Sequence, residues 1–253
     1  MTRRALSFGA AASAYERFRP GYPDELVDQV LDYAGQPVTS ALEIGAGTGK
    51  ATCAFAARGI AVTATEPDPA MVAELRKHVP PSVVTVQAAF EDLPLTGGYD
   101  LVFAAASLHW TSSDQRGPRL AAMLKRNAVF ASFGGPMRLA DPAVEAAVHA
   151  ARSKWLASDD VPSQGDGTPV DSSMQWPGTE LIKSGLFVDV VQAEIERRVV
   201  MTARDYTGHL STISAYLELP DTVRGKVLDQ VLHALPQQVT VNADLTVHLA
   251  RKA

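Results

Sequence analysis

A glycine-rich turn flanked by two acids is the part of the sequence best suited to bind a ligand. The turn is built from Glu43, Gly45, Ala46, Gly47, Thr48 and Gly49. Glycine has no Cβ, so the backbone of such a turn can bend sharply and approach a ligand closely. Glu66 stands 21 positions after Gly45. An acid at that place accepts hydrogen bonds from ribose hydroxyls in nucleotide-binding folds, so the sequence predicts a ligand with a ribose.

The residues around the turn predict the elements that hold it in place. Residues 38–44 form a short apolar run of strand length, 50–57 have a helical pattern, and 60–65 form a second strand ending at Glu66. A helix that starts directly after the turn points its unpaired N–H groups at the ligand. The predicted unit is therefore strand, turn, helix and strand.

The spacing of the glycines distinguishes between cofactors. A dinucleotide-binding G-x-G-x-x-G pattern counted from Gly45 needs its third glycine at the position of Lys50. A phosphate-binding loop aligned on Gly49 needs a glycine at Ile44 and a hydroxyl at Ala51. Neither pattern fits, so a nicotinamide-dependent oxidoreductase stays only as a less favoured alternative.

A second candidate for chemistry follows a buried strand. Residues 99–106 are almost all apolar, as in a strand covered on both faces, and they lead into Ser107, Leu108, His109 and Trp110. Ligands of open α/β sheets bind at the carboxyl ends of the strands. His109 is therefore the best candidate for proton transfer or substrate contact. The alternative is a structural histidine bonded to the backbone beside a packed Trp110.

Three stretches resemble one family. The glycine turn with its two acids resembles the first motif of class I S-adenosylmethionine-dependent methyltransferases, and FAAASLHW at 103–110 resembles the fourth. The pattern of Phe8, Ala12, Tyr15, Arg19 and the prolines after it resembles the N-terminal segment of small-molecule, trans-aconitate methyltransferase-like members.

The resemblance implies a single Rossmann-like α/β domain over 1–253. Its sheet would have seven mostly parallel strands with helices on both faces. Residues 1–36 would form an arm and helix over the cofactor, and 137–178 a small helical and loop cap inserted after the fifth strand. Further helices are expected at 24–33, 67–77, 119–125, 142–156, 179–183, 202–217 and 220–235, and further strands at 83–86, 128–133, 187–201 and 238–250.

The resemblance also implies the cofactor, S-adenosyl-L-methionine, and its binding residues. These are Tyr15, Arg19, Glu43, Gly45, Ala46, Gly47, Thr48, Gly49, Glu66, Pro67, Met71, Ala89, Phe90, Glu91 and Ala105. Tyr15 and Arg19 would reach the cofactor carboxylate, for which a guanidinium offers paired donors. Family members often carry an acid where Ala89 stands, so Phe90 and Glu91 are expected to recognise the adenine instead.

The implied reaction is methyl transfer to a small organic acceptor by in-line displacement, at oxygen, nitrogen or carbon. The protein must hold the acceptor at near-attack distance and exclude water. A phenol acceptor would profit from His109 as a base, whereas a carboxylate would need none. A protein that binds S-adenosylmethionine without moving the methyl group remains the alternative. Tyr206, Thr212 and Ser214 would either face the substrate or pack in the core, and the core is favoured.

Composition limits the other possibilities. The chain of 253 residues is 46% hydrophobic, enough for a large core, and its net charge of −5 argues against nucleic acid as a partner. Cys53 is the only cysteine, so no disulfide within the chain and no cysteine-built zinc site is expected, and we predict no metal. No apolar run reaches membrane-spanning length. Arg3, Arg4 and the small residues after them only faintly resemble an export signal. We expect a cytoplasmic monomer or homodimer.

Overall fold

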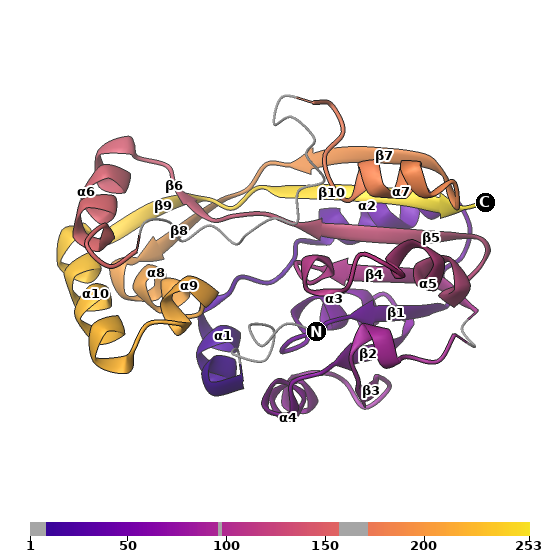
Figure 1. Cartoon of the computed structure of the whole chain (residues 1–253), viewed down its shortest axis with the longest axis horizontal. Helices are drawn as coiled ribbons and strands as arrows, with labels where there is room; N and C mark the ends of the chain where they lie inside the picture. Colours follow the sequence, from indigo (N-terminus) through magenta and orange to yellow (C-terminus); the bar gives the residue numbers. More distant parts are fainter. Residues whose placement is uncertain (1–8, 96–97, 157–171) are drawn as a thin grey trace.

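A computed structural model describes residues 9–95, 98–156 and 172–253. Phe8, the first half of the export-like stretch and most of the predicted loop 158–176 lie outside these residues. Within them, seven strands form the main sheet in the order β3-β2-β1-β4-β5-β10-β7 (Figure 1). They are β1 (Ser40–Ile44), β2 (Ala61–Glu66), β3 (Val84–Gln87), β4 (Tyr99–Ala105), β5 (Leu124–Gly134), β7 (Phe187–Ile195) and β10 (Leu245–Lys252).

The pairing of these strands confirms the predicted fold class. β1 runs parallel to β2 and β4, β2 to β3, and β4 to β5. Only β10 is antiparallel to its neighbours, β5 and β7. The parallel strands therefore end at one edge, where the glycine turn after β1 meets the tips of β2 and β4.

Helices cover both faces of the main sheet. They are α2 (Asp24–Ala34), α3 (Lys50–Ala56), α4 (Pro69–His78), α5 (Arg116–Met123) and α7 (Gly178–Ser184). Successive side chains of β4 point to opposite faces of the sheet and belong to two different cores. Phe103 packs with α2 and α3, whereas Val102 packs with α5 and α7. In the first core, the Phe55 ring stacks on the Phe103 ring with centroids 4.3 Å apart. None of the helices that the structure describes is long and apolar enough to cross a bilayer.

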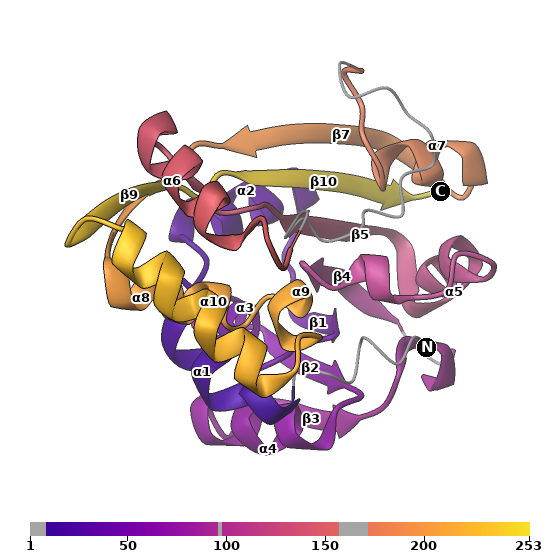
Figure 2. The ribbon, with the colours of Figure 1, turned by 60° about the vertical axis from the view of Figure 1, so that its left-hand side comes forward.

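A second lobe stands at the carboxyl end of β5 and carries its own small sheet (Figures 1 and 2). Its strands are β6 (Arg138–Leu139), β8 (Arg198–Thr202) and β9 (Gln238–Asn242), and its helices are α6 (Pro142–Arg152), α8 (Ala203–Leu210), α9 (Ser214–Leu217) and α10 (Asp221–Ala234). Val148, Tyr206, Tyr216, Val231 and Val241 belong to a third core inside this lobe. The lobe therefore rests on packing of its own beside the edge where the parallel strands end.

The predicted cap insertion, 137–178, accounts for only part of this lobe. β6 and α6 come from it, whereas the other elements come from residues 198–242. The extended stretches predicted at 187–201 and 238–250 each divide into two strands that belong to different sheets, and the helix predicted at 202–217 divides into α8 and α9. The chain crosses between sheets at Arg197 and Ala243, where the Ala243 N–H donates to the Arg197 carbonyl at 2.7 Å.

The N-terminal arm joins the two parts of the molecule. A short turn at Gly9–Ala11 leads into α1 (Ala12–Phe18), which contacts both α4 of the main sheet and α8 of the lobe. At its contact with the lobe, a Cβ on Gly208 would lie 2.7 Å from the Phe18 ring. The arm thus lies between the lobe and the helix that follows Glu66.

Candidate functional site

The glycine turn after β1 has the left-handed backbone that its sequence predicts. Gly45 has φ +66° and Gly47 has φ +57°, a region that side chains with a Cβ rarely adopt. A Cβ on Gly45 would also lie 2.7 Å from the Cβ of Ser107, which follows β4. On Gly47 the nearest atom would be Tyr15 Cε1 at 4.0 Å. Gly45 therefore lets two loops pack together, while the Gly47 backbone faces the N-terminal arm.

Glu66 lies at the tip of β2 with both carboxylate oxygens engaged by backbone. Gly47 N–H donates to Oε2 at 2.9 Å, and Asp68 N–H donates to Oε1 at 3.0 Å. Asp68 in turn caps α4 by accepting from the N–H groups of Ala70 and Met71 at 2.8 and 3.1 Å. Each carboxylate oxygen has a second lone pair. Glu66 is therefore held in one orientation and can still accept two hydroxyl protons.

Glu43 lies below the turn and is 1% exposed. The Thr52 hydroxyl donates to its Oε2, and within the described part of the chain its Oε1 has no hydrogen-bond partner. Burial raises the pKa of Glu43 to about 8, so the group is mainly protonated at neutral pH. The Thr48 hydroxyl is also buried, and among the described residues it has no hydrogen-bond partner. Unpaired buried polar atoms are costly, so the turn fits a ligand that brings polar groups to it.

The arm places the Tyr15 ring beside Gly47 and places Arg19 next to that ring. The Arg19 guanidinium lies 5.1 Å from the centroid of the Tyr15 ring. Arg19 Nε donates to Thr212 Oγ1 at 2.9 Å, and Nη2 donates to the Thr212 carbonyl at 3.3 Å. Thr212 is fully buried, in agreement with the favoured interpretation from the sequence. The structure adds that it holds Arg19 in place from the lobe.

The loop after β3 lies next to Glu66, since the Ala88 N–H donates to the Glu66 carbonyl at 3.2 Å. Ala89 precedes a one-turn 3-10 helix, Phe90–Asp92. The Phe90 ring is 4% exposed and packs in the core, so the prediction for Phe90 now rests on its backbone N–H. Glu91 Oε1 accepts from the Ser112 N–H at 2.7 Å, which ties this loop to the one after β4.

His109 lies in a 3-10 turn, Leu108–Trp110, that follows Ala105 at the end of β4. Its ring centroid is 4.6 Å from that of Trp110. Burial, together with the charge of Arg116, lowers the pKa of His109 to about 4. The imidazole is therefore neutral at pH 7 and can accept a hydrogen bond, but it is a weak base.

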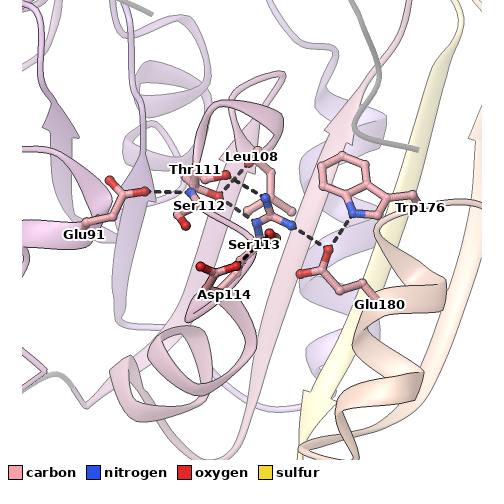
Figure 3. Close-up of polar contacts among 9 residues, drawn as sticks. Glu91, Leu108, Thr111, Ser112, Ser113, Asp114, Trp176 and Glu180 are labelled. Carbon is pink, nitrogen blue, oxygen red and sulfur yellow. Dashed lines mark hydrogen bonds and ion pairs between the residues drawn. The ribbon is translucent and has the colours of Figure 1, made fainter. Parts of the chain in front are cut away.

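A buried arginine that the sequence analysis did not identify fixes this turn (Figure 3). Arg116 is 1% exposed, and its Nε and Nη2 donate to the hydroxyl and the carbonyl of Thr111, each at 2.7 Å. Its Nη1 pairs with Glu180 Oε2 at 2.5 Å, and the Trp176 indole N–H donates to the same oxygen at 2.7 Å. Arg116 thus joins the loop after β4 to α7. No local pattern in the sequence indicates these contacts.

The remaining predicted residues lie around the same edge. The Ala46 N–H donates to the Thr65 carbonyl at 2.8 Å and so fastens the turn to β2. Pro67 follows Glu66 and is half-buried, whereas Met71 is 3% exposed in the core. In residues 9–95, 98–156 and 172–253, no group of three or more His, Cys, Asp or Glu side chains is placed to hold a metal ion.

Comparison with known proteins agrees with this geometry. Residues 41–127 match a family described as a methyltransferase domain. An uncharacterized methyltransferase of Mycobacterium tuberculosis is 31% identical over 232 residues, which cover 91% of this chain and 86% of that protein. The chain belongs to the class I S-adenosylmethionine-dependent methyltransferases. The order of strands in the main sheet of this methyltransferase agrees with that membership.

Solved structures show the same fold. A putative type II methyltransferase from Anaeromyxobacter dehalogenans superimposes with a TM-score of 0.66 at 26% identity, over 92% of this methyltransferase and 98% of that chain. A phosphoethanolamine N-methyltransferase of Haemonchus contortus, solved with S-adenosylhomocysteine and phosphomonomethylethanolamine, has a TM-score of 0.54 at 14% identity. The match covers 96% of this chain and 57% of that one. At that identity the likeness concerns the fold alone.

Proposed function

We propose that this methyltransferase moves the methyl group of S-adenosylmethionine to a small organic molecule, as in the trans-aconitate methyltransferase-like subfamily. The proposed binding of S-adenosylmethionine is supported by the Glu66 carboxylate, which is fixed between the N–H groups of Gly47 and Asp68. The glycine spacing had left a nicotinamide-dependent oxidoreductase as an alternative function. Because the chain belongs to a methyltransferase family, we no longer favour that alternative.

In this proposal, different residues around the turn bind different parts of the cofactor. When bound, S-adenosylmethionine supplies an electrophilic methyl carbon on a positively charged sulfur. In this proposal Glu66 accepts the ribose hydroxyls, and Arg19 offers its guanidinium to the carboxylate beside the Tyr15 ring. The Phe90 N–H meets the adenine, since the acid common at the position of Ala89 is absent.

The acceptor would lie between the Leu108–Trp110 turn and the lobe. Burial lowers the pKa of His109 to about 4, so its imidazole is a weak base and is poorly suited to remove a proton from a weakly acidic acceptor. This favours an acceptor that ionises on its own, such as a carboxylic acid. The net charge of −5 speaks against a nucleic-acid acceptor.

The test is release of S-adenosylhomocysteine from a panel of acceptors. The protein is incubated with S-adenosylmethionine and with separate sets of carboxylic acids, phenols and amines. We expect release above the level without acceptor for at least one carboxylic acid. Binding of the cofactor in calorimetry without release for any set would instead support a protein that binds S-adenosylmethionine without transferring the methyl group.

A further inference from the structure

Two arginines of helix α5, one turn apart, contact the two loops that follow β3 and β4. Arg116 holds Thr111 in the loop after β4. Arg119 reaches the other way, to the loop after β3. The helix itself packs on the sheet through Leu120 and Met123, which are both fully buried. The two side chains therefore project from a support that is fixed by the core.

Arg119 makes three hydrogen bonds to backbone carbonyls. Its Nε and Nη2 donate to the Phe90 carbonyl at 3.2 and 3.0 Å, and Nη2 also donates to the Leu93 carbonyl at 2.6 Å. Its guanidinium lies 5.4 Å from the centroid of the buried Phe90 ring. A planar guanidinium presents its donors in a rigid fork and so holds two carbonyls in one geometry, whereas the donors of a lysine ammonium rotate on a flexible stem. Arg119 thus fixes both ends of the Phe90–Asp92 turn.

This arrangement decides which groups of the loop remain for a ligand. The carbonyls of Phe90 and Leu93 are taken by Arg119, and Glu91 Oε1 accepts from Ser112. The first N–H groups of a helical turn have no partner within the turn. Because Arg119 engages the Phe90 and Leu93 carbonyls, the N–H groups at the start of the turn are the backbone groups that this loop could offer to a ligand beside Glu66.

We propose that Arg119 is a positioning residue that sets the base selectivity of the cofactor site. The proposal rests on the proposed binding of S-adenosylmethionine. The N1 atom of adenine is an acceptor and pairs with a fixed N–H, whereas N1 of hypoxanthine carries a hydrogen and clashes with the same donor. The donor discriminates only if the loop cannot turn, and the Arg119 contacts hold it.

The test compares two ligands that differ only in the base, S-adenosylhomocysteine and S-inosylhomocysteine. Their dissociation constants are measured by calorimetry for the wild type, Arg119→Met and a control, Arg126→Met, whose side chain is exposed on β5. We expect the wild type to prefer the adenine ligand at least about tenfold, and Arg119→Met to reduce this ratio about fivefold or more. Arg126→Met should keep the ratio of the wild type.

A purely structural role for Arg119 gives a different result. If Arg119→Met weakens both ligands equally and the ratio stays, the proposal is wrong, and it is also wrong if the wild type shows no preference. If the methionine variant does not fold, Arg119→Lys is measured instead, since lysine keeps the charge but lacks the rigid planar fork. An unchanged ratio in that variant also overturns the proposal. Failure of the wild type to bind S-adenosylhomocysteine would refute the proposed function itself, and the selectivity proposal with it.

Discussion

At the scale of single residues, the carboxylate of Glu66 is held in one orientation by the backbone around it. Two backbone N–H groups hold it, one from the glycine turn and one from the start of α4. Burial is the main cause that raises its pKa, and the N–H groups of Asp68 and Gly47 oppose that shift. In the proposed complex the side chain would therefore need no reorientation to accept two hydroxyl protons, which would lower the entropic cost of binding.

Replacing Glu66 by alanine removes this acceptor. We expect the binding free energy for S-adenosylmethionine to weaken by about 1–3 kcal/mol, the usual cost of losing hydrogen bonds to a charged group. Calorimetry measures the change, and thermal unfolding checks that the variant is folded. Glu196→Ala, at an exposed acid in the connection between β7 and β8, is the matched control and should bind normally. Unchanged affinity in Glu66→Ala would contradict the ribose assignment.

At the scale of elements, the N-terminal arm depends on a close helix contact. Gly208 of α8 lies against the Phe18 ring of α1, and Arg19 bonds to Thr212 just beyond α8. Because Tyr15 and Arg19 sit on this arm, its distance from the lobe determines where they stand relative to the glycine turn. The predicted arm over the cofactor is thus positioned by a part of the chain nearly two hundred residues away.

A methyl group at position 208 should displace the arm. In Gly208→Ala the new Cβ would lie 2.7 Å from the Phe18 ring, and we expect a loss of about 1–3 kcal/mol in the free energy of unfolding together with weaker cofactor binding. Gly225→Ala is the control, because it lies in α10 with no atom within 4 Å of the new Cβ. That variant should gain about 0.5–1 kcal/mol, since alanine favours a helix interior over glycine. Denaturant unfolding and calorimetry compare the two, and equal behaviour would argue against the contact.

At the scale of the whole molecule, buried titratable groups predict how stability depends on pH. Burial is the main cause that lowers the pKa of His109 and His248 to about 4 and that of His209 to about 3. Unfolded histidines bind protons below about 6.5, so the free energy of unfolding should fall as pH falls from 6.5 toward 4. Glu43, with its raised pKa of about 8, acts in the opposite sense. Its folded carboxyl keeps a proton that the unfolded chain loses, so stability also falls as pH rises toward 8.

The expected result is a maximum of stability near pH 6.5, because the three histidines outweigh Glu43 below that pH, whereas above it the histidines no longer contribute and Glu43 continues to lower the free energy of unfolding. Denaturant unfolding at pH 5 to 9 measures the curve. Glu43→Gln keeps a hydrogen bond to Thr52 without a titrating proton, and we expect it to be more stable than the wild type at pH 8 by at least about 1 kcal/mol. A variant with the same slope as the wild type above pH 6.5 would show that Glu43 is ionised in the folded protein.

The sequence by itself determined the strand, glycine turn, helix and strand around Gly47, the place of Glu66 at the end of β2 and the place of His109 after β4. These features depend on residues close together in the chain, where the alternation of apolar residues and the conformation of glycine act directly. Only the tertiary structure decided that 187–201 and 238–250 each cross between two sheets, since alternation continues through a crossing. The same holds for the contacts of Arg119 with Phe90, 29 positions away, and of Arg19 with Thr212, 193 positions away. Such pairs meet because the sheet brings distant loops to one edge, and no local pattern of residues records that meeting.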